Sequence, residues 1–366
     1  MEKLFISKDN TLVNLSNSIL NYFGVKPFHS TLTALDKILK ETKKEKVALV
    51  LFDGFGKVIA DYYKESIHFI YEHKEFILDS IFPPTTVAAT TSLTTGLYPI
   101  ETGHIGWSQY FSLYKRPINV FISNDKLEPF IKYPSVQQNL LKPVYIWELI
   151  NKTQKFNAAS ISSYEKKTYA KEDDMDYLFE NADKLVKTHD FVYIYSSYPD
   201  HLLHDYGCFN ETVKENLIFL ENKLKKLVEE NKDTLFLLVA DHGFHDCEEI
   251  SIKEHQDFYD LLDKKYFVIE PTFASFFVKN KEKFLELANK YYRDNFFIYS
   301  KEELLKDNIL GFGKANEYAL ETLGDFFLIS KNKYMFNDGE QPVGFKGAHA
   351  SGKEEDKKLY LFAFNK

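Results

Sequence analysis

This chain of 366 residues has few cysteines and no long apolar run. It has two cysteines, Cys208 and Cys247, which are too few for a disulfide framework, so we expect two buried, inert thiols. No apolar run reaches the ~20 residues that span a bilayer. Residues 1–9 also lack the apolar segment of a signal peptide. We therefore expect a cytoplasmic protein without membrane contact.

Positive charge is also in the minority. The chain has 46 basic and 54 acidic residues, a formal net charge of −8. This balance argues against stable binding to nucleic acid, whose phosphate backbone attracts basic surfaces. It is compatible with a small phosphate ester as substrate, because bound divalent cations reverse the local field of an acidic site. The sequence carries no signal for an oligomeric state.

Short apolar strands alternate with helical segments along most of the chain. The pattern predicts strands at 47–52, 156–162, 190–196, 234–240 and 357–364, and helices at 11–22, 57–71, 144–152, 174–188 and 210–231. This alternation is typical of an α/β fold, a three-layer αβα sandwich with a mostly parallel central sheet. We expect one domain over residues 1–366, with cap or insert regions at 108–140 and 250–340.

Aspartates follow three of the predicted strands, at Asp53, Asp200 and Asp241. Ligands of parallel sheets bind beyond the carboxyl ends of the strands, so these side chains are expected to lie near one another. His242 follows Asp241 directly, and His204 shares one helical face with Asp200. Carboxylate and imidazole groups are ligands for zinc and related metals. Each motif taken alone also fits a simple helix cap.

Two more segments extend this pattern. His349 lies among small residues at 347–352, just before the last strand, which suits a ligand on a loop or a solvated histidine. The threonine-rich segment 84–96 follows a proline pair and predicts a helix that starts near Thr85 or Thr86. A hydroxyl there lies beside backbone N–H groups that favour an anion. It fits a nucleophile that becomes phosphorylated, or an ordinary N-cap.

Taken together, these motifs resemble the alkaline phosphatase superfamily, specifically its type I phosphodiesterase/nucleotide pyrophosphatase branch. The matching segments, in the family's order, are VLFDGFG at 50–56, FPPTTVAATTSLTTGLYPIETGHIGW at 82–107, YPDHLLHDYG at 198–207, LLVADHGF at 237–244 and GAHASG at 347–352. The resemblance implies an alkaline phosphatase-like fold. It also implies a phosphoester hydrolase with two divalent metal ions, zinc being expected and manganese the alternative.

The resemblance further implies a role for each position. One metal would be held by Asp53, Thr86, Asp241 and His242, and the other by Asp200, His204 and His349. The family's nucleophile lies ten residues before the glycine of its T-G-L-Y-P stretch, here Gly96, which selects Thr86 and implies a phosphothreonine intermediate. The backbone N–H of Val87 and the side chain of Lys346 are candidate substrate contacts.

One segment departs from the family pattern. Nucleotide pyrophosphatases usually follow the nucleophile with Phe-Pro-Asn, whereas residues 87–89 are Val-Ala-Ala. The first hypothesis is a phosphodiesterase acting on nucleotide-type or small organic diesters. A phosphomonoesterase or phosphonate hydrolase, and a non-catalytic binding module with the same fold, are the alternatives. His104 and His245 lie near the motifs without matching ligand positions, so we expect structural roles for them.

Overall fold

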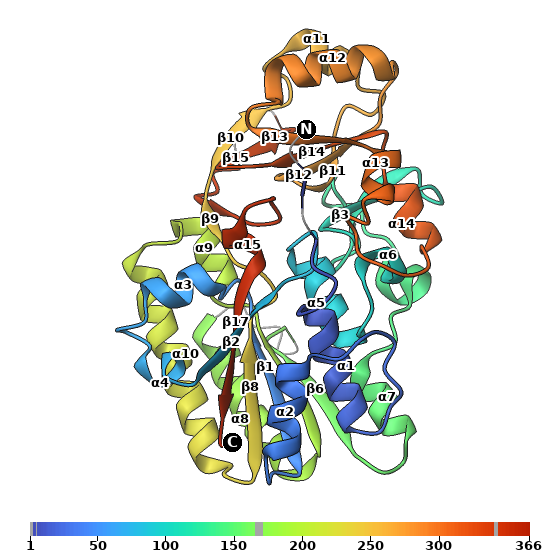
Figure 1. The fold of residues 1–366 in the computed structure, drawn as a ribbon. Coiled ribbons are helices and arrows are strands. Elements are labelled where there is room, and N and C mark those ends of the chain that lie inside the picture. Colours follow the sequence, from blue (N-terminus) through green and yellow to red (C-terminus); the bar gives the residue numbers. More distant parts are fainter. Residues whose placement is uncertain (1–2, 5, 165–170, 340–342) are drawn as a thin grey trace.

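Six strands form the sheet at the centre of the molecule, in the order β2-β17-β8-β1-β7-β6 (Figure 1). The computed structural model describes residues 3–4, 6–164, 171–339 and 343–366. The strands are β1 Lys46–Phe52, β2 Lys74–Asp79, β6 Ala158–Ser162, β7 Phe191–Ser196, β8 Thr234–Val239 and β17 Lys358–Phe364. Within this sheet β17 runs antiparallel to both neighbours, and the other pairs are parallel. The predicted mostly parallel sheet is confirmed.

The central strand β1 is buried on both faces. Residues 47–52 are each at most 1% exposed. Val50 pairs with Ile194 of β7 and with Leu238 of β8, so β1 lies between two other apolar strands. Because neither face of this strand contacts solvent, its residues do not alternate between apolar and polar. This explains the continuous apolar run in the sequence.

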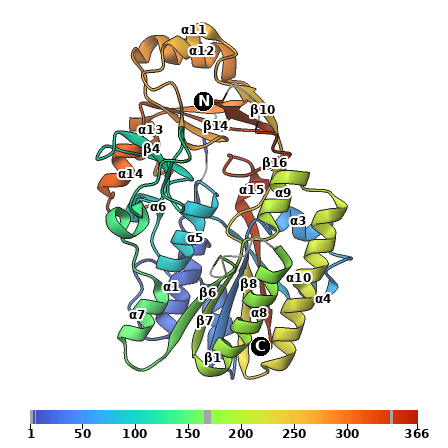
Figure 2. The same ribbon diagram turned by 180° about the vertical axis from the view of Figure 1, so that it is seen from behind.

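Helices cover both faces of this sheet (Figures 1 and 2). One layer contains α1 Leu12–Tyr22, α2 Thr33–Glu41, α5 Thr86–Thr95 and α7 Ile146–Lys152; the other contains α3 Lys57–Tyr62, α4 His68–Tyr71, α8 Lys171–Thr188, α9 Asp200–Tyr206 and α10 Glu211–Glu230. The αβα sandwich is confirmed. The single helix predicted over 57–71 is wrong, because the chain turns after α3. The Tyr63 hydroxyl donates to the carbonyl oxygens of Cys208 and Asn210, which fixes this turn against α10.

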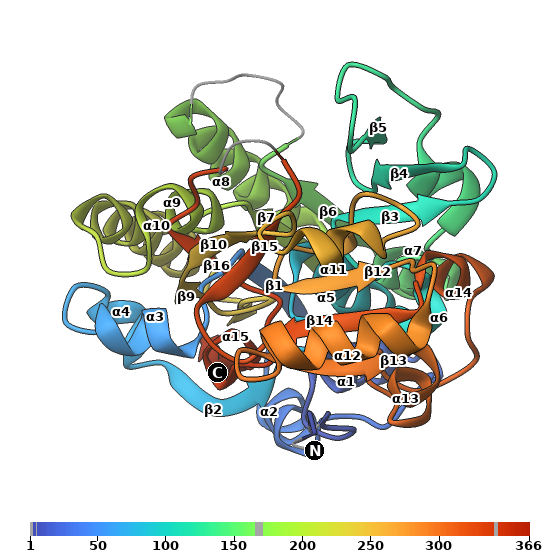
Figure 3. The same cartoon turned by 90° about the horizontal axis from the view of Figure 1, so that it is seen from above.

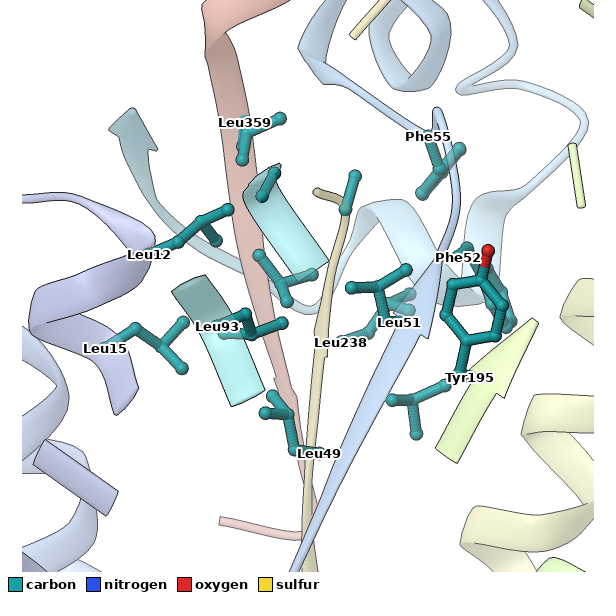
Figure 4. Close-up of a cluster of buried hydrophobic side chains, with 14 of the residues drawn as sticks. Leu12, Leu15, Leu49, Leu51, Phe52, Phe55, Leu93, Tyr195, Leu238 and Leu359 are labelled. Carbon is teal, nitrogen blue, oxygen red and sulfur yellow. The ribbon is translucent and has the colours of Figure 1, made fainter. Parts of the chain in front are cut away.

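Helix α5 contains the threonine run, and every residue from 87 to 95 in it is buried. Threonine hydroxyls tolerate this burial because they donate to the helix backbone one turn earlier. Thr90 donates to Thr86 O at 2.6 Å, and Thr94 donates to Thr90 O at 2.7 Å. Figure 4 shows Leu93 of α5 among Leu12 and Leu15 of α1 and the strand side chains. The helix therefore lies inside the protein, with its first residue at the carboxyl edge of the sheet.

A second, seven-stranded antiparallel sheet lies beyond the carboxyl ends of the parallel strands (Figures 1 and 3). Its order is β13-β14-β12-β11-β3-β4-β5. Its strands are β3 Ser108–Phe111, β4 Arg116–Asn119, β5 Asn124–Asp125, β11 Val268–Glu270, β12 Phe273–Phe276, β13 Phe296–Ser300 and β14 Phe326–Ser330. The segments predicted as cap or insert regions thus supply this second sheet.

Short elements complete the fold. They are the helices α6 Pro99–Thr102, η1 Gln137–Leu141, α11 Gln256–Asp260, α12 Lys281–Tyr292, α13 Lys301–Lys306, α14 Glu317–Thr322 and α15 Glu354–Lys357, and the strand pairs β9 His245–Asp246 with β16 Gly347–Ala348 and β10 Glu248–Ser251 with β15 Tyr334–Asn337. No helix within the described residues is long and apolar enough to cross a membrane.

Shortening a side chain in the central sheet should destabilise the whole protein. Leu238 of β8 is fully buried, so Leu238→Ala leaves a cavity and should lower the free energy of unfolding by about 2–5 kcal/mol. Ile77 on the edge strand β2 is 43% exposed, and Ile77→Ala should cost less than about 1 kcal/mol. Urea unfolding of the two variants tests this. Equal losses would contradict the burial assigned to β8.

Candidate active site

Three loops meet where β1, β7 and β8 end. Because β1 lies between the other two strands, Asp53, Asp200 and Asp241 come from neighbouring loops. The loops after β1 and β8 touch through glycines: a Cβ atom on Gly56 would lie 2.3 Å from the Cα of Gly243. A larger residue cannot approach so closely. The two glycines therefore let the loops that carry Asp53 and Asp241 pack directly together.

The first predicted ligand set converges around the ring of His242. Its Nε2 lies 3.2 Å from Asp53 Oδ1 and 3.4 Å from Asp241 Oδ2. The Thr86 hydroxyl, at the start of α5, lies 3.1 Å from the same Nε2 and 3.4 Å from Asp53 Oδ1. Both aspartates and His242 are buried. The structure thus brings all four residues of this set together.

The second predicted set surrounds Asp200, the first residue of α9. Its Oδ1 lies 3.6 Å from Nε2 of His204, one helical turn later, and 3.8 Å from Nε2 of His349. The Nδ1 atom of His204 lies 2.9 Å from Gly347 O, which links α9 to the loop that carries His349. Asp200 Oδ1 is also 4.0 Å from His242 Nε2, so the two sets adjoin.

The arrangement suits divalent cations. Ligand atoms lie within 4.8 Å of one another in two groups, Asp53 with Asp241 and His242, and Asp200 with His242 and His349. Asp200 Oδ1 and Asp241 Oδ2 are buried and have no hydrogen-bond partner among the described residues. Leaving such oxygens unpaired is costly. A cation with a preference for oxygen and imidazole ligands would satisfy both, and zinc has that preference.

The carboxylates repel one another strongly. Burial, followed by the negative charge of Asp53, raises the pKa of Asp200 well above its usual range and that of Asp241 to about 8. Burial alone would lower the pKa of His242, but Asp241 and Asp53 raise it to about 10. Burial likewise opposes ionisation of Asp53, yet the hydrogen bond from His242 lowers its pKa. Excess negative charge in a buried space is the condition that bound metal ions relieve.

The two histidines of the second set are neutral. Burial lowers the pKa of His204 to about 4. Burial and the nearby charge of His242 lower the pKa of His349 well below its usual range. A neutral imidazole keeps the lone pair that binds a metal. Both rings are therefore in the protonation state that a ligand requires.

Other side chains fix these ligands in place. The Tyr195 hydroxyl donates to Asp53 Oδ2 at 2.5 Å. His245 Nδ1 lies 2.7 Å from Asp356 Oδ1, and Asp356 also accepts from the backbone N–H and hydroxyl of Ser351. This buried cluster fixes the loop after His349. Tyr195 was not predicted, because the sequence does not distinguish it from the other aromatic residues of β7.

Glu270, at the end of β11, is a second residue of the site that was not predicted from the sequence. Its side chain is buried, and its Oε1 accepts hydrogen bonds from the Thr85 hydroxyl at 2.6 Å and from the backbone N–H of Trp107 at 2.7 Å. Burial raises its pKa to about 7, against the effect of these hydrogen bonds. Its signal in the sequence was an isolated charge within the apolar segment 266–278.

The two predicted substrate contacts lie in different surroundings. Val87 is the second residue of α5; its side chain is buried in an apolar cluster, so only its backbone N–H faces the start of the helix. The backbone N–H of Lys346 donates to the carbonyl oxygen of His204 at 2.8 Å. Lys346 lines a hollow with Asp205, Tyr206, Gly207, Phe209 and Asp246.

The raised pKa of Glu270 predicts a pH effect on stability in the metal-free protein. The folded state holds the proton between pH 4.5, the ordinary value, and about 7, whereas the unfolded chain releases it. Wild-type stability should therefore fall relative to Glu270→Gln as the pH rises through this window, by up to about 3 kcal/mol. Urea unfolding from pH 4 to 8 with a chelator measures this. Parallel stability curves for both proteins would contradict it.

Comparison with known proteins identifies the family. The model of the family described as type I phosphodiesterase/nucleotide pyrophosphatase matches residues 47–352. A search of curated protein sequences gives no match.

Solved structures match the fold. Murine ectonucleotide pyrophosphatase/phosphodiesterase 5, as an inactive variant in complex with AMP, is 17% identical with a TM-score of 0.64, and the match covers 87% of each chain. The human protein of the same name is 16% identical with a TM-score of 0.63, again over 87% of each chain. The family match spans most of the sequence, from residue 47 to residue 352. The chain therefore belongs to the type I phosphodiesterase/nucleotide pyrophosphatase family and is a phosphoric ester hydrolase.

Proposed function

We propose that this protein hydrolyses phosphodiesters with Thr86 as nucleophile and two metal ions, most suitably zinc, held by the two ligand sets. The convergence of all seven predicted residues carries the proposal: the Thr86 hydroxyl lies 3.1 Å from His242 Nε2, beside the carboxylate of Asp53. One ion would be bound by Asp53, Thr86, Asp241 and His242, and the other by Asp200, His204 and His349. When bound, the ions supply positive charge that favours ionisation of the hydroxyl and stabilises the charge on the phosphoryl group.

The chain's own residues carry the covalent chemistry. Thr86 Oγ1 forms a bond to phosphorus while the bond from phosphorus to the leaving alcohol breaks, and the threonine proton ends on that alcohol. The product is a phosphothreonine diester. Water then attacks phosphorus, the bond to Thr86 breaks, and the hydroxyl regains a proton. The first-turn N–H groups of α5 have no partner within the helix, so that of Val87 can donate to a phosphoryl oxygen throughout.

The surroundings of Thr86 support a diester as substrate. Residues 87–89 are fully buried and offer a phosphate only their backbone. The carboxylate of Glu270 lies beside the nucleophile, because it accepts a hydrogen bond from the hydroxyl of the preceding residue, Thr85. A monoester carries one more ionisable oxygen, which a carboxylate disfavours. AMP bound to the murine relative supports a nucleotide-type ester as one candidate substrate.

Metal binding should stabilise the protein through these ligands. Zinc at 100 times its Kd should add about 2.7 kcal/mol to the free energy of unfolding, seen as a rise in melting temperature after chelator treatment. Asp241→Asn should lose most of this rise. The matched control is Asp233→Asn, at the exposed opposite end of β8, which should keep it. An equal rise in both variants would exclude Asp241 as a ligand.

Removing the nucleophile should abolish turnover. Thr86→Ala should reduce hydrolysis of bis-p-nitrophenyl phosphate by about 10³-fold or more. Thr94→Ala is the matched control, because its hydroxyl donates only to the backbone of the same helix, and it should stay near wild type. p-Nitrophenyl phosphate should be the poorer substrate for the wild type. Wild-type rates in Thr86→Ala would refute the assignment, and faster monoester turnover would identify a phosphomonoesterase.

A further inference from the structure

The N-cap residue of the nucleophile helix does not cap it. Thr85 has the extended backbone of an N-cap, but its side chain makes no capping hydrogen bond. An N-cap threonine normally accepts from the second or third N–H of its helix, here those of Val87 and Ala88. Instead, the Thr85 hydroxyl donates to Glu270 Oε1 at 2.6 Å.

Glu270 joins three separate segments. Its Oε1 accepts from Thr85, which directly precedes the nucleophile, and from the backbone N–H of Trp107 at 2.7 Å. The carboxylate is only 6% exposed. Burying a carboxylate costs free energy unless hydrogen bonds compensate for the lost water. The two hydrogen bonds to Glu270 supply that compensation.

The backbone beside Glu270 adopts an unusual conformation. Ile269 has φ +82°, a region that a β-branched residue rarely adopts. Its neighbour in space is Gly106, where a Cβ atom would lie 2.6 Å from Ile269 Cγ2 and 3.0 Å from Ile269 Cα. Such strained conformations cluster at functional sites. The strained residue and the close glycine both serve to present Glu270 at the start of α5.

We propose that Glu270 is a positioning residue for the reaction: it holds the Thr85 hydroxyl out of its capping position and so keeps the N–H groups of Val87 and Ala88 free for phosphoryl oxygens. This inference rests on the proposed function of Thr86. The buried oxygens of Asp200 and Asp241, unpartnered among the described residues, adjoin the nucleophile and independently mark the place where charged ligands bind.

A positioning role for Glu270 and a purely structural role predict different results for one pair of variants. If Glu270 only connects β11 to α5, then Glu270→Ala and Glu270→Ala/Thr85→Val should weaken phosphate binding equally, because both remove the hydrogen bond. If Glu270 restrains a competing hydroxyl, Glu270→Ala frees that hydroxyl to cap α5 and to compete with phosphate. Removing the hydroxyl as well, in Glu270→Ala/Thr85→Val, should then restore phosphate binding.

The test uses the zinc-loaded protein. The inhibition constants of inorganic phosphate and orthovanadate are measured, together with kcat and KM for bis-p-nitrophenyl phosphate. Glu270→Ala should weaken phosphate inhibition about 5- to 10-fold, the equivalent of one N-cap hydrogen bond. Glu270→Gln keeps an oxygen acceptor and should stay within about twofold of wild type. The double variant should regain most of the affinity. Asp61→Ala is the matched control, since this half-buried carboxylate accepts from Tyr71 and Tyr360 on α4 and β17.

The outcomes separate the two proposals. A wild type without diesterase activity or phosphate inhibition would refute the proposed function. An active wild type with unchanged Glu270→Ala, or with a double variant no better than Glu270→Ala, would overturn the role of Glu270.

Thr85→Asn provides a second test that leaves Glu270 in place, should Glu270→Ala fail to fold. Asparagine is a strong N-cap, so it should keep or raise the melting temperature while weakening phosphate inhibition. Unchanged inhibition in this variant would also overturn the role of Glu270.

Discussion

Three carboxylates, Asp53, Asp200 and Asp241, are buried side by side where the parallel strands end, and their mutual repulsion constrains the rest of the site. His242 offsets part of this charge through its contacts with Asp53 and Asp241. Even so, one oxygen each of Asp200 and Asp241 is buried without a hydrogen-bond partner among the described residues. The apolar sheet makes this possible because it holds the loops rigidly enough to keep like charges together. The carboxylates are therefore preorganised for binding cations.

Helix α5, whose first residue Thr86 is the proposed nucleophile, meets a different requirement. Its first residue must reach the charged loops, so the rest of the helix passes through the apolar layer between α1 and the sheet. Small residues allow that passage, and threonine hydroxyls remain bonded to the helix backbone. The same burial prevents residues 87–89 from offering side chains to a substrate. Beside Thr86, these residues therefore offer only backbone N–H groups.

The second sheet links the substrate side of the site to distant parts of the sequence. It brings Glu270 of β11 to Thr85, and the Thr272 hydroxyl to the carbonyl oxygen of His349. It thus contacts the segments on both sides of the ligand cluster. The family resemblance assigned the ligands and the nucleophile, but it assigned nothing on this sheet.

The sequence by itself determined the parallel sheet and the aspartates at its carboxyl edge. The choice of Thr86 came from the family resemblance, through the spacing to Gly96, and stays a prediction. The sheet and its aspartates are local features: an apolar run predicts a buried strand, and the turn that follows it carries the ligand. The break after α3, the bond from Tyr195 to Asp53 and the position of Glu270 were decided only by the tertiary structure. Each depends on partners that lie 140 or more residues away in the chain, and no local pattern of residue types specifies which of many similar side chains will meet there.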